Sequence, residues 1–373
     1  MKILILANID MGLYKFRREL LETLTKEHKV FFCVPHGEFT KKIEDTGCKY
    51  IPSNMLDRRS TNPIKDLLLL FDYKKIVSQI KPDVVLTYTI KPNVYGGLVC
   101  RQSKISYIAN ITGLGTSIEN GGLLSTISMW LYKIGLKKAS CVFFQNEYNM
   151  TLFTEKGIVN NQAKIIPGSG VNLNEHNYEQ YPDTDTFIRF LFIGRIMKDK
   201  GIDELLSAFD EVHKKYTNIR LDIVGGCDEQ SYFSVLQEAQ SVGYIKYHNQ
   251  QENVHDFIKN THCTVLPSYH EGIANVLLES AATGRPVIAT RVPGCVETFD
   301  DEVSGIGCDA RNINSLVEAI ERFIELPHNK KKQMGIAGRK KMEKEFDRSI
   351  VINAYCEEIK KIHNNGGKTN VSL

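Results

Sequence analysis

The sequence predicts an α/β protein made of two doubly wound, Rossmann-like domains. Strand-like apolar runs alternate with helix-like segments along the 373 residues, which is the pattern of parallel sheets. A chain of this length can form two domains. Glycine, asparagine and proline cluster at 167–185 and separate two sets of strands. No run of about 18 apolar residues occurs, so no membrane-spanning helix is expected.

The expected strands fall on either side of that cluster. We predict an N-terminal domain over residues 1–167, a C-terminal domain over 168–348 and a final helix at about 349–366, with a disordered polar tail from about residue 364. The first set of strands is 2–7, 29–34, 83–87, 106–109, 141–144 and 164–166. The second set is 189–193, 220–224, 244–247, 263–266 and 287–290.

Composition and charge restrict the class of protein. Nine cysteines without a C-x-x-C spacing fit a reducing compartment, and make a zinc site unexpected. The chain starts directly in a strand without the pattern of a signal peptide, so a cytoplasmic location is expected. Residues 1–170 carry a net charge of +9 and the remainder −6. The basic half suggests an anionic partner, but nucleic acid is not expected because no recognition motif is present.

The most informative motif lies at 267–286. It contains two acids, Glu271 and Glu279, separated by seven residues, and it stands between the strands 263–266 and 287–290. Glu271 therefore follows the carboxyl end of a buried strand, which is where open α/β sheets bind ligands.

A helix is expected to begin directly after Glu271. Unpaired amides at a helix N-terminus favour phosphate, and a carboxylate beside them is expected to contact sugar hydroxyls instead. The residues that open this helix are Gly272, Ile273, Ala274 and Asn275.

A second element supports a diphosphate site. Arg195 and Lys200 follow the strand 189–193 and precede a helix at about 202–215. Arginine offers a planar fork of donors and lysine a point charge, and both suit phosphate oxygens. The alternative is that these are solvated loop charges, which is the interpretation we give to Lys198.

Together these motifs resemble the E-x7-E element of retaining glycosyltransferases of family four, which have the GT-B fold. The resemblance implies two Rossmann-like domains facing across a cleft, with the nucleotide sugar in the C-terminal domain, the acceptor in the N-terminal domain, and the final helix crossing back onto the N-terminal domain. It implies that Arg195 and Lys200 hold the donor diphosphate, Glu271 the donor sugar and Glu279 the ribose. Glu271, Arg195 and Lys200 are the expected catalytic residues. The other expected donor contacts are Gly12, Gly272, Ile273, Ala274, Asn275 and Glu279.

The N-terminal half should contact the acceptor. Gly12 follows the first strand, where it would permit close approach of the backbone. The basic and polar side chains near the ends of the first, third and fourth strands are the candidate acceptor contacts, although charge on a helix surface explains those of the first helix equally well. These candidates are Tyr14, Lys15, Arg17, Lys91 and Asn110.

The segment 122–138 indicates a lipid surface. It contains Trp130, the only tryptophan, beside Tyr132 and three lysines. Aromatic and basic side chains together suit a bilayer surface, while a core helix with a solvated basic end is the alternative. The resemblance is to bacterial enzymes that extend lipid-pyrophosphate-linked glycans. We therefore expect a UDP-sugar donor, an N-acetylhexosamine as the transferred sugar, a lipid-linked acceptor and peripheral contact with an anionic membrane at the inner face of the cell membrane.

The expected mechanism needs no cofactor, metal or protein base. Many members of this family have a histidine in the first domain, and neither 84–93 nor 106–115 contains one. In a front-face retaining transfer the leaving phosphate oxygen can accept the acceptor's proton, so the protein contributes mainly positioning and charge stabilisation. The Asp-x-Asp pair Asp183 and Asp185 could hold a metal in another glycosyltransferase fold, but here it lies in a polar interdomain stretch.

Three other classes of protein remain as alternatives. A UDP-sugar epimerase of the same architecture would also bind the nucleotide, but would need acid and base residues. An NAD-dependent oxidoreductase would need a G-x-G-x-x-G turn after the first strand, where this chain has only Gly12. A non-catalytic sugar- or nucleotide-binding protein would not need Arg195, Lys200, Glu271 and Glu279 all to be present.

Overall fold

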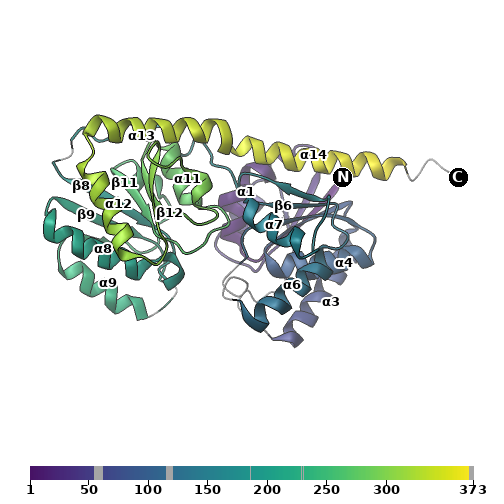
Figure 1. The fold of residues 1–373 in the computed structure, drawn as a ribbon. Helices are drawn as coiled ribbons and strands as arrows, with labels where there is room; N and C mark the ends of the chain where they lie inside the picture. Colours follow the sequence, from purple (N-terminus) through teal and green to yellow (C-terminus); the bar gives the residue numbers. More distant parts are fainter. Residues whose placement is uncertain (54–61, 115–120, 185, 228, 230, 369–373) are drawn as a thin grey trace. The chain divides into compact units, whose positions relative to one another are not determined.

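The computed structural model describes residues 1–53, 62–114, 121–184, 186–227, 229 and 231–368. The chain forms two compact units, which are described separately (Figure 1). Unit 1 comprises Met1–Ser169 and Ser349–Leu373, and unit 2 comprises Gly170–Arg348. No helix among the described residues is both long and apolar enough to span a bilayer.

Unit 1 contains a seven-stranded parallel sheet in the order β3-β2-β1-β4-β5-β6-β7. The chain leaves β1 in one direction to form β2 and β3, and later in the other direction to form β4 to β7, so the order reverses between β1 and β4. The strands are β1 (Lys2–Leu6), β2 (Lys29–Cys33), β3 (Lys49–Tyr50), β4 (Val84–Tyr88), β5 (Ser106–Ile111), β6 (Cys141–Phe144) and β7 (Ala163–Ile165).

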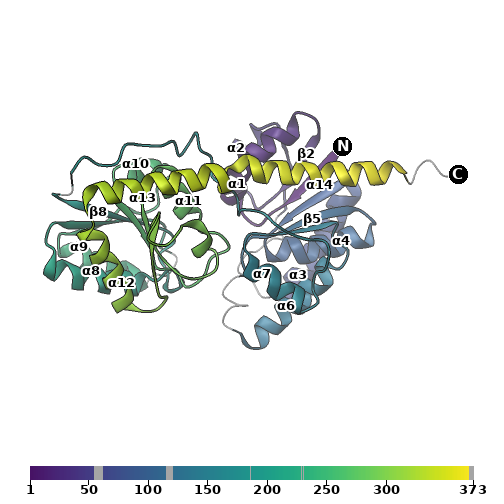
Figure 2. The same cartoon turned by 45° about the horizontal axis from the view of Figure 1, so that its top comes forward.

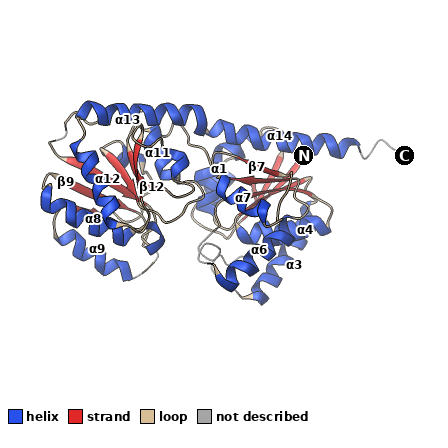
Figure 3. Cartoon of the chain, viewed as in Figure 1, coloured by secondary structure: helices blue, strands red, loops and turns tan. Residues whose placement is uncertain are grey.

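Helices cover both faces of this sheet, because its strands are apolar on both sides (Figures 1 and 3). Alternate residues of β1 show this: Leu4 and Leu6 join one core cluster, whereas Ile3 and Ile5 join the other. The first cluster packs against α3 (Pro63–Ile80), the π-helical turn η1 (Pro92–Gly96), α4 (Gly97–Gln102), α6 (Gly122–Leu136) and α7 (Glu147–Glu155). The second packs against α1 (Asp10–Thr25), α2 (Thr40–Glu44) and α14 (Arg348–Lys368).

The final helix, α14, belongs to the core of unit 1. Val351, Tyr355 and Ile359 lie one turn apart and are buried with the residues of β1, β4 and β6. Residues 364–368 continue this helix, so the prediction of a disordered tail from residue 364 is wrong for that stretch. Residues 369–373 of the predicted tail lie outside the described residues.

Unit 2 contains a six-stranded parallel sheet in the order β10-β9-β8-β11-β12-β13. Its order reverses between β8 and β11. The strands are β8 (Ile188–Ile193), β9 (Ile219–Val224), β10 (Ile245–Tyr247), β11 (Cys263–Leu266), β12 (Val287–Thr290) and β13 (Gly305–Cys308). The helices are α8 (Ile202–Lys215), α9 (Ser231–Ser241), α10 (His255–Ile258), α11 (Asn275–Ala282), α12 (Ile313–Glu325) and α13 (His328–Lys341), with short turns η2 (Lys198–Lys200), η3 (Val296–Thr298) and η4 (Met342–Phe346).

The two sheets confirm the predicted α/β class with two Rossmann-like sheets. Two edge strands, β3 and β13, were not predicted, and there is a physical reason why the sequence did not indicate each of them. β3 is two residues long, which is too short to produce an alternating pattern. β13 contains two glycines in four residues, and glycine is depleted in strands.

Candidate active site

The candidate site lies at the switch point of the sheet in unit 2, which is the place between β8 and β11 where the strand order reverses. β8 and β11 are hydrogen-bonded neighbours, and the segments that follow their carboxyl ends both carry charged residues. Arg195 and Lys200 follow β8, and Glu271 follows β11. Parallel strands place such segments at the same edge of the sheet, so residues 71 positions apart in sequence meet there.

Lys200 and Glu271 form an ion pair. The Lys200 ammonium donates to Glu271 Oε1, and the two side chains are 16% and 15% exposed. The Ser268 hydroxyl donates to the same carboxylate oxygen at 2.9 Å. Ser268 is itself buried, and its carbonyl accepts from the Thr290 hydroxyl at 2.5 Å. The carboxylate is therefore held in place from β11 and β12 while part of it still faces solvent.

Two glycines allow the loops of the site to approach one another. Gly201 has φ +69°, and a Cβ there would lie 2.1 Å from the carbonyl oxygen of Pro267. Gly294 has φ +83°, and a Cβ there would lie 2.4 Å from the carbonyl oxygen of Glu271. Only glycine fits both the dihedral angle and the space at these positions, so both positions bear on the placement of Glu271.

Further polar groups surround the pair. The Tyr269 amide donates to the Asp199 carbonyl at 2.9 Å, and the Tyr269 hydroxyl donates to Glu204 Oε1 at 2.7 Å. The Arg311 guanidinium lies 4.5 Å from the centre of the Tyr269 ring. His270 Nε2 lies 3.7 Å from Asp199 Oδ2. The contacts with Asp199 and Glu204 tie the segment after β11 to the segment after β8, whereas Arg311 reaches Tyr269 from the segment after β13. No spacing in the sequence indicated these contacts.

The helix after Glu271 begins later than predicted. α11 starts at Asn275, and the amide of Ala274 donates to the Gly294 carbonyl at 2.7 Å. That amide is engaged within the chain in this structure, and the donor contact of Ala274 stays a prediction. Gly272 and Ile273 are buried in the segment before the helix, and Glu279 lies half-buried in α11. Arg195 is exposed directly after Gly194.

Among the site residues predicted in unit 1, Gly12, Tyr14, Lys15 and Lys91 lie in or beside helices and differ from two others that are almost fully buried. Gly12 lies inside α1 rather than in the turn that we expected, and a Cβ there would be 3.0 Å from Ile9 Cγ2. Tyr14 and Lys15 are half-buried on the same helix. Lys91 forms an ion pair with Asp66 at 2.7 Å, with its side chain 12% exposed.

Arg17 and Asn110 are placed in the interior of unit 1 instead. Arg17 is 4% exposed and Asn110 is 1% exposed. The Asn110 amide donates to the Tyr355 hydroxyl of α14 at 2.7 Å, and the Arg17 guanidinium lies 5.3 Å from the centre of the Tyr88 ring. Both side chains are enclosed within unit 1 in this structure, and their contact with the acceptor stays a prediction.

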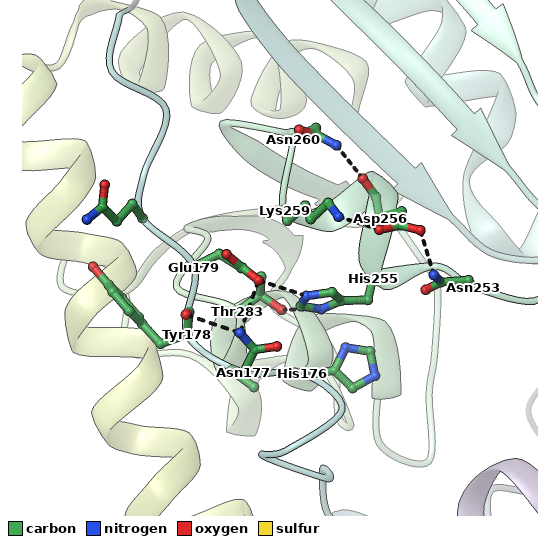
Figure 4. Close-up of polar contacts among 12 residues, drawn as sticks. His176, Asn177, Tyr178, Glu179, Asn253, His255, Asp256, Lys259, Asn260 and Thr283 are labelled. Atoms are coloured by element: carbon green, nitrogen blue, oxygen red, sulfur yellow. Dashed lines mark hydrogen bonds and ion pairs between the residues drawn. The ribbon is translucent and has the colours of Figure 1, made fainter.

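A second polar cluster in unit 2 lies along residues 176–179 (Figure 4). His255 contacts the Glu179 carboxylate at 3.3 Å and the Thr283 hydroxyl at 3.5 Å. Burial, with nearby His255 and Arg348, lowers the pKa of His176 to about 3. No three potential metal ligands lie together among the described residues, and Asp185 of the Asp-x-Asp pair lies outside them.

Arg285 explains part of the motif at 267–286 that the sequence left unassigned. It is fully buried, and its guanidinium donates to the carbonyls of Glu179 at 3.0 Å, Gln180 at 2.8 Å and Lys259 at 2.6 Å. Burial lowers its pKa to about 10. Arg285 thus anchors the 176–181 segment on unit 2 and is a structural residue rather than a ligand contact.

Two family models and two relatives that match this chain are all glycosyltransferases. The glycosyl transferases group 1 model matches residues 175–341, and the glycosyl transferase 4-like model matches residues 2–146. The chain is 26% identical over 376 residues to the N,N'-diacetylbacillosaminyl-diphospho-undecaprenol alpha-1,3-N-acetylgalactosaminyltransferase of Campylobacter jejuni, covering 96% of this chain and 98% of the relative. It is 29% identical over 178 residues to the capsular polysaccharide biosynthesis glycosyltransferase CapM of Staphylococcus aureus, covering 46% and 45%.

Solved structures show the same fold. Anabaena Alr3699/HepE in complex with UDP and glucose has a TM-score of 0.81 at 16% identity, covering 96% of this chain and 99% of that one. The sucrose-phosphate synthase of Thermosynechococcus elongatus has a TM-score of 0.82 at 18% identity, covering 98% and 100%. With the family models matched in both units, the chain belongs to the group 1 and family-four-like glycosyltransferases and has the GT-B fold.

Proposed function

We propose that this glycosyltransferase moves an N-acetylhexosamine from a UDP-sugar to a lipid-pyrophosphate-linked glycan, with retention of anomeric configuration. The observation that carries the proposal is the largely buried but still accessible Lys200–Glu271 pair at the point in unit 2 where the strand order reverses. The Campylobacter relative, aligned over nearly the whole chain, is named for transfer of N-acetylgalactosamine to a diphospho-undecaprenol-linked sugar, which supports the sugar and the acceptor. The UDP and glucose bound to the Anabaena structure support the donor class.

The charges of the site fit the proposed chemistry. In the transfer, the bond between the sugar's C1 and the UDP oxygen breaks, and a bond from C1 to the acceptor oxygen forms. The acceptor's proton passes to the departing phosphate oxygen, so no protein base is required. Negative charge grows on the diphosphate as it leaves, and Arg195 and Lys200 offset it because they are positioned before the reaction.

Glu271 has a separate role in this proposal. Its carboxylate, held by Ser268 and Lys200, accepts hydrogen bonds from the hydroxyls of the donor sugar and fixes its orientation. Lys200 would then contact both the carboxylate and the diphosphate, and so would keep the two negative groups close together. Glu279 is proposed to bind the ribose, and metal independence follows from this use of two cationic side chains in place of a metal ion.

Nucleotide binding tests the proposal directly. A ligand that binds only the folded state raises the melting temperature. We expect UDP to raise it in the presence of a chelator, and ADP, GDP, CMP and NAD to have little effect. Lys200→Ala and Arg195→Ala should each reduce the UDP shift, whereas the exposed neighbour Lys198→Ala should keep it.

The outcomes separate the possible classes of enzyme. A shift with NAD and none with any nucleoside diphosphate would contradict the proposal and favour an oxidoreductase. Unchanged UDP affinity in both the Lys200 and the Arg195 variants would place the diphosphate elsewhere. Where UDP binds as expected, incubation with UDP-N-acetylhexosamines and a lipid-pyrophosphate glycan should extend the glycan, and conversion of the free UDP-sugar to its epimer would contradict transfer.

A further inference from the structure

Large apolar side chains are exposed on two helices of unit 1. On α3 they are spaced as one helical stripe, i, i+3, i+4 and i+7, and a similar stripe is exposed on α6. We call this the α3/α6 face. Its residues are Ile64, Leu67, Leu68, Phe71, Leu123, Leu124, Ile127 and Trp130. Leu123 is 77% exposed and Trp130 is 59% exposed, so the face is not part of the core of unit 1.

The two stripes belong to one layer of unit 1. The inner sides of α3 and α6, which include Leu69, Tyr73, Met129 and Tyr132, are buried in the same core cluster against the sheet. Both helices pack against η1 and α4, and both views show them side by side (Figures 1 and 2). Large apolar side chains exposed together on two neighbouring helices mark an interaction surface.

Basic residues accompany the apolar ones in the same order on both helices. On α3, Lys74 and Lys75 follow Phe71 by one turn, and on α6, Lys133 and Lys137 follow Trp130 by one and two turns. All four lysines are exposed. In each helix the first half therefore presents apolar side chains and the second half presents positive charge.

Within the described residues of α3 and α6, no acidic side chain is paired with these four lysines. α6 contains no Asp or Glu. On α3, Asp66 is bound by Lys91 at 2.7 Å and by the Tyr95 hydroxyl at 2.9 Å, and Asp72 accepts from the Ser53 hydroxyl at 2.5 Å. The α3/α6 face thus combines an apolar area with exposed lysines, which matches the apolar interior and anionic headgroups of a bilayer surface.

We infer that the α3/α6 face docks unit 1 on an anionic lipid bilayer, with its apolar side chains among the acyl chains and its lysines at the phosphate layer. This inference rests on the proposed function, because membrane docking serves the enzyme only if its acceptor is linked to a lipid in that membrane. A face of this kind would hold the enzyme where its acceptor is concentrated.

Trp130 provides the direct measurement, because it is the only tryptophan in the chain and lies in the face. The full-length protein is mixed with vesicles of phosphatidylcholine, with or without phosphatidylglycerol. We expect the Trp130 emission to shift to shorter wavelength with the anionic vesicles, and the protein to float with them in a density gradient. Added salt should weaken binding, because it screens the lysines.

Variants separate this face from other exposed apolar residues. Leu67→Ser with Phe71→Ser keeps Trp130 and should weaken vesicle binding about tenfold or more, because two buried apolar contacts are lost. Lys133→Ala with Lys137→Ala should weaken binding to anionic vesicles only. Phe233→Ser on α9 of unit 2, where the side chain is 51% exposed, is the matched control and should bind vesicles like the original protein.

The overturning results differ from those that would overturn the proposed function. A protein that responds to UDP but neither floats nor changes its emission with anionic vesicles would overturn the docking inference alone. A dimer that the Leu67 and Phe71 changes dissociate, with no vesicle binding, would make the face an interface between copies and would also overturn it. Vesicle binding without any response to UDP would support the docking inference and contradict the proposed function.

Discussion

Both units hold polar residues near the carboxyl ends of their parallel strands, but these residues differ in exposure. In unit 2, Lys200 and Glu271 meet after β8 and β11 and remain about one-sixth exposed, with their charges paired. In unit 1, Arg17 and Asn110 lie near the carboxyl ends of β4 and β5 and are almost completely buried. No ion pair to Arg17 forms among the described residues, and its Nε and Asn110 Oδ1 lack hydrogen-bond partners there.

The difference follows from what covers each sheet edge. In unit 1, α14 returns to the sheet, and the buried Tyr355 hydroxyl accepts from Asn110. In unit 2, glycines at 201 and 294 bring loops close to Glu271 without covering its carboxylate. Polar residues near the carboxyl ends of parallel strands are thus partly accessible in unit 2 and enclosed in unit 1, where one of them contacts α14.

The largest expected effect is that of Glu271→Ala on transfer. Because the carboxylate is proposed to orient the donor sugar, its removal should lower kcat by about 100- to 1000-fold, similar to the loss of one preorganised group in other active sites. Steady-state kinetics and a thermal melt measure activity and folding together. Glu318→Ala, an exposed acid on α12, is the control. Near-normal turnover by folded Glu271→Ala would remove Glu271 from the site.

The contact between Asn110 and Tyr355 should affect stability and not nucleotide binding. Asn110→Ala and Tyr355→Phe should each lower the unfolding free energy of unit 1 by about 1–3 kcal/mol, because a buried partner is left unsatisfied. The double variant should lose less than the sum. Urea unfolding followed by Trp130 fluorescence reports on unit 1. A reduced UDP-induced thermal shift in these variants would show that the cluster contributes to ligand binding after all.

The stability of unit 2 should fall on acidification because of His176. Its pKa is lowered from 6.5 to about 3 by burial, so the unfolded chain binds a proton more readily than the folded chain. Stability is therefore present above pH 6.5 and decreases as the pH falls toward 3, by about 2 kcal/mol between pH 7 and pH 5. Scanning calorimetry at the two pH values measures this. His176→Leu should flatten the dependence, and exposed His363→Leu should leave it unchanged.

The smallest effect is expected for Ser268, which contacts Glu271 but is not proposed to touch the substrate. Ser268→Ala removes the 2.9 Å hydrogen bond and leaves the Lys200 contact, so kcat should fall about tenfold while the KM for the UDP-sugar stays the same. Ser234→Ala on α9 serves as the control. A change in KM alone would mean that Ser268 acts on binding instead of on the orientation of Glu271.

Patterns in the sequence were sufficient for much of the fold. The central strands β1, β4, β6, β11 and β12 are nearly continuous apolar runs, because parallel strands are buried on both faces. These runs predicted the α/β class. β3 and β13 were not predicted, because β3 is too short and β13 too rich in glycine to show such a run. Arg195, Lys200, Glu271 and Glu279 could also be named as site candidates from their positions after strands and from the E-x7-E spacing. Their roles in catalysis remain predictions.

Only the tertiary structure decided which polar residues are accessible. Arg17 in α1 and Lys200 in the turn η2 are both basic residues that follow a strand of a Rossmann-like sheet, and the sequence did not indicate which of them is accessible. Arg17 is enclosed in unit 1 beside the Tyr88 ring of β4, whereas Lys200 pairs with Glu271 from the segment after a neighbouring strand. Burial depends on such long-range contacts, as do the carbonyl contacts of Arg285 and the alignment of the two apolar helix faces. Local sequence determines the elements, whereas accessibility arises only when distant elements pack together.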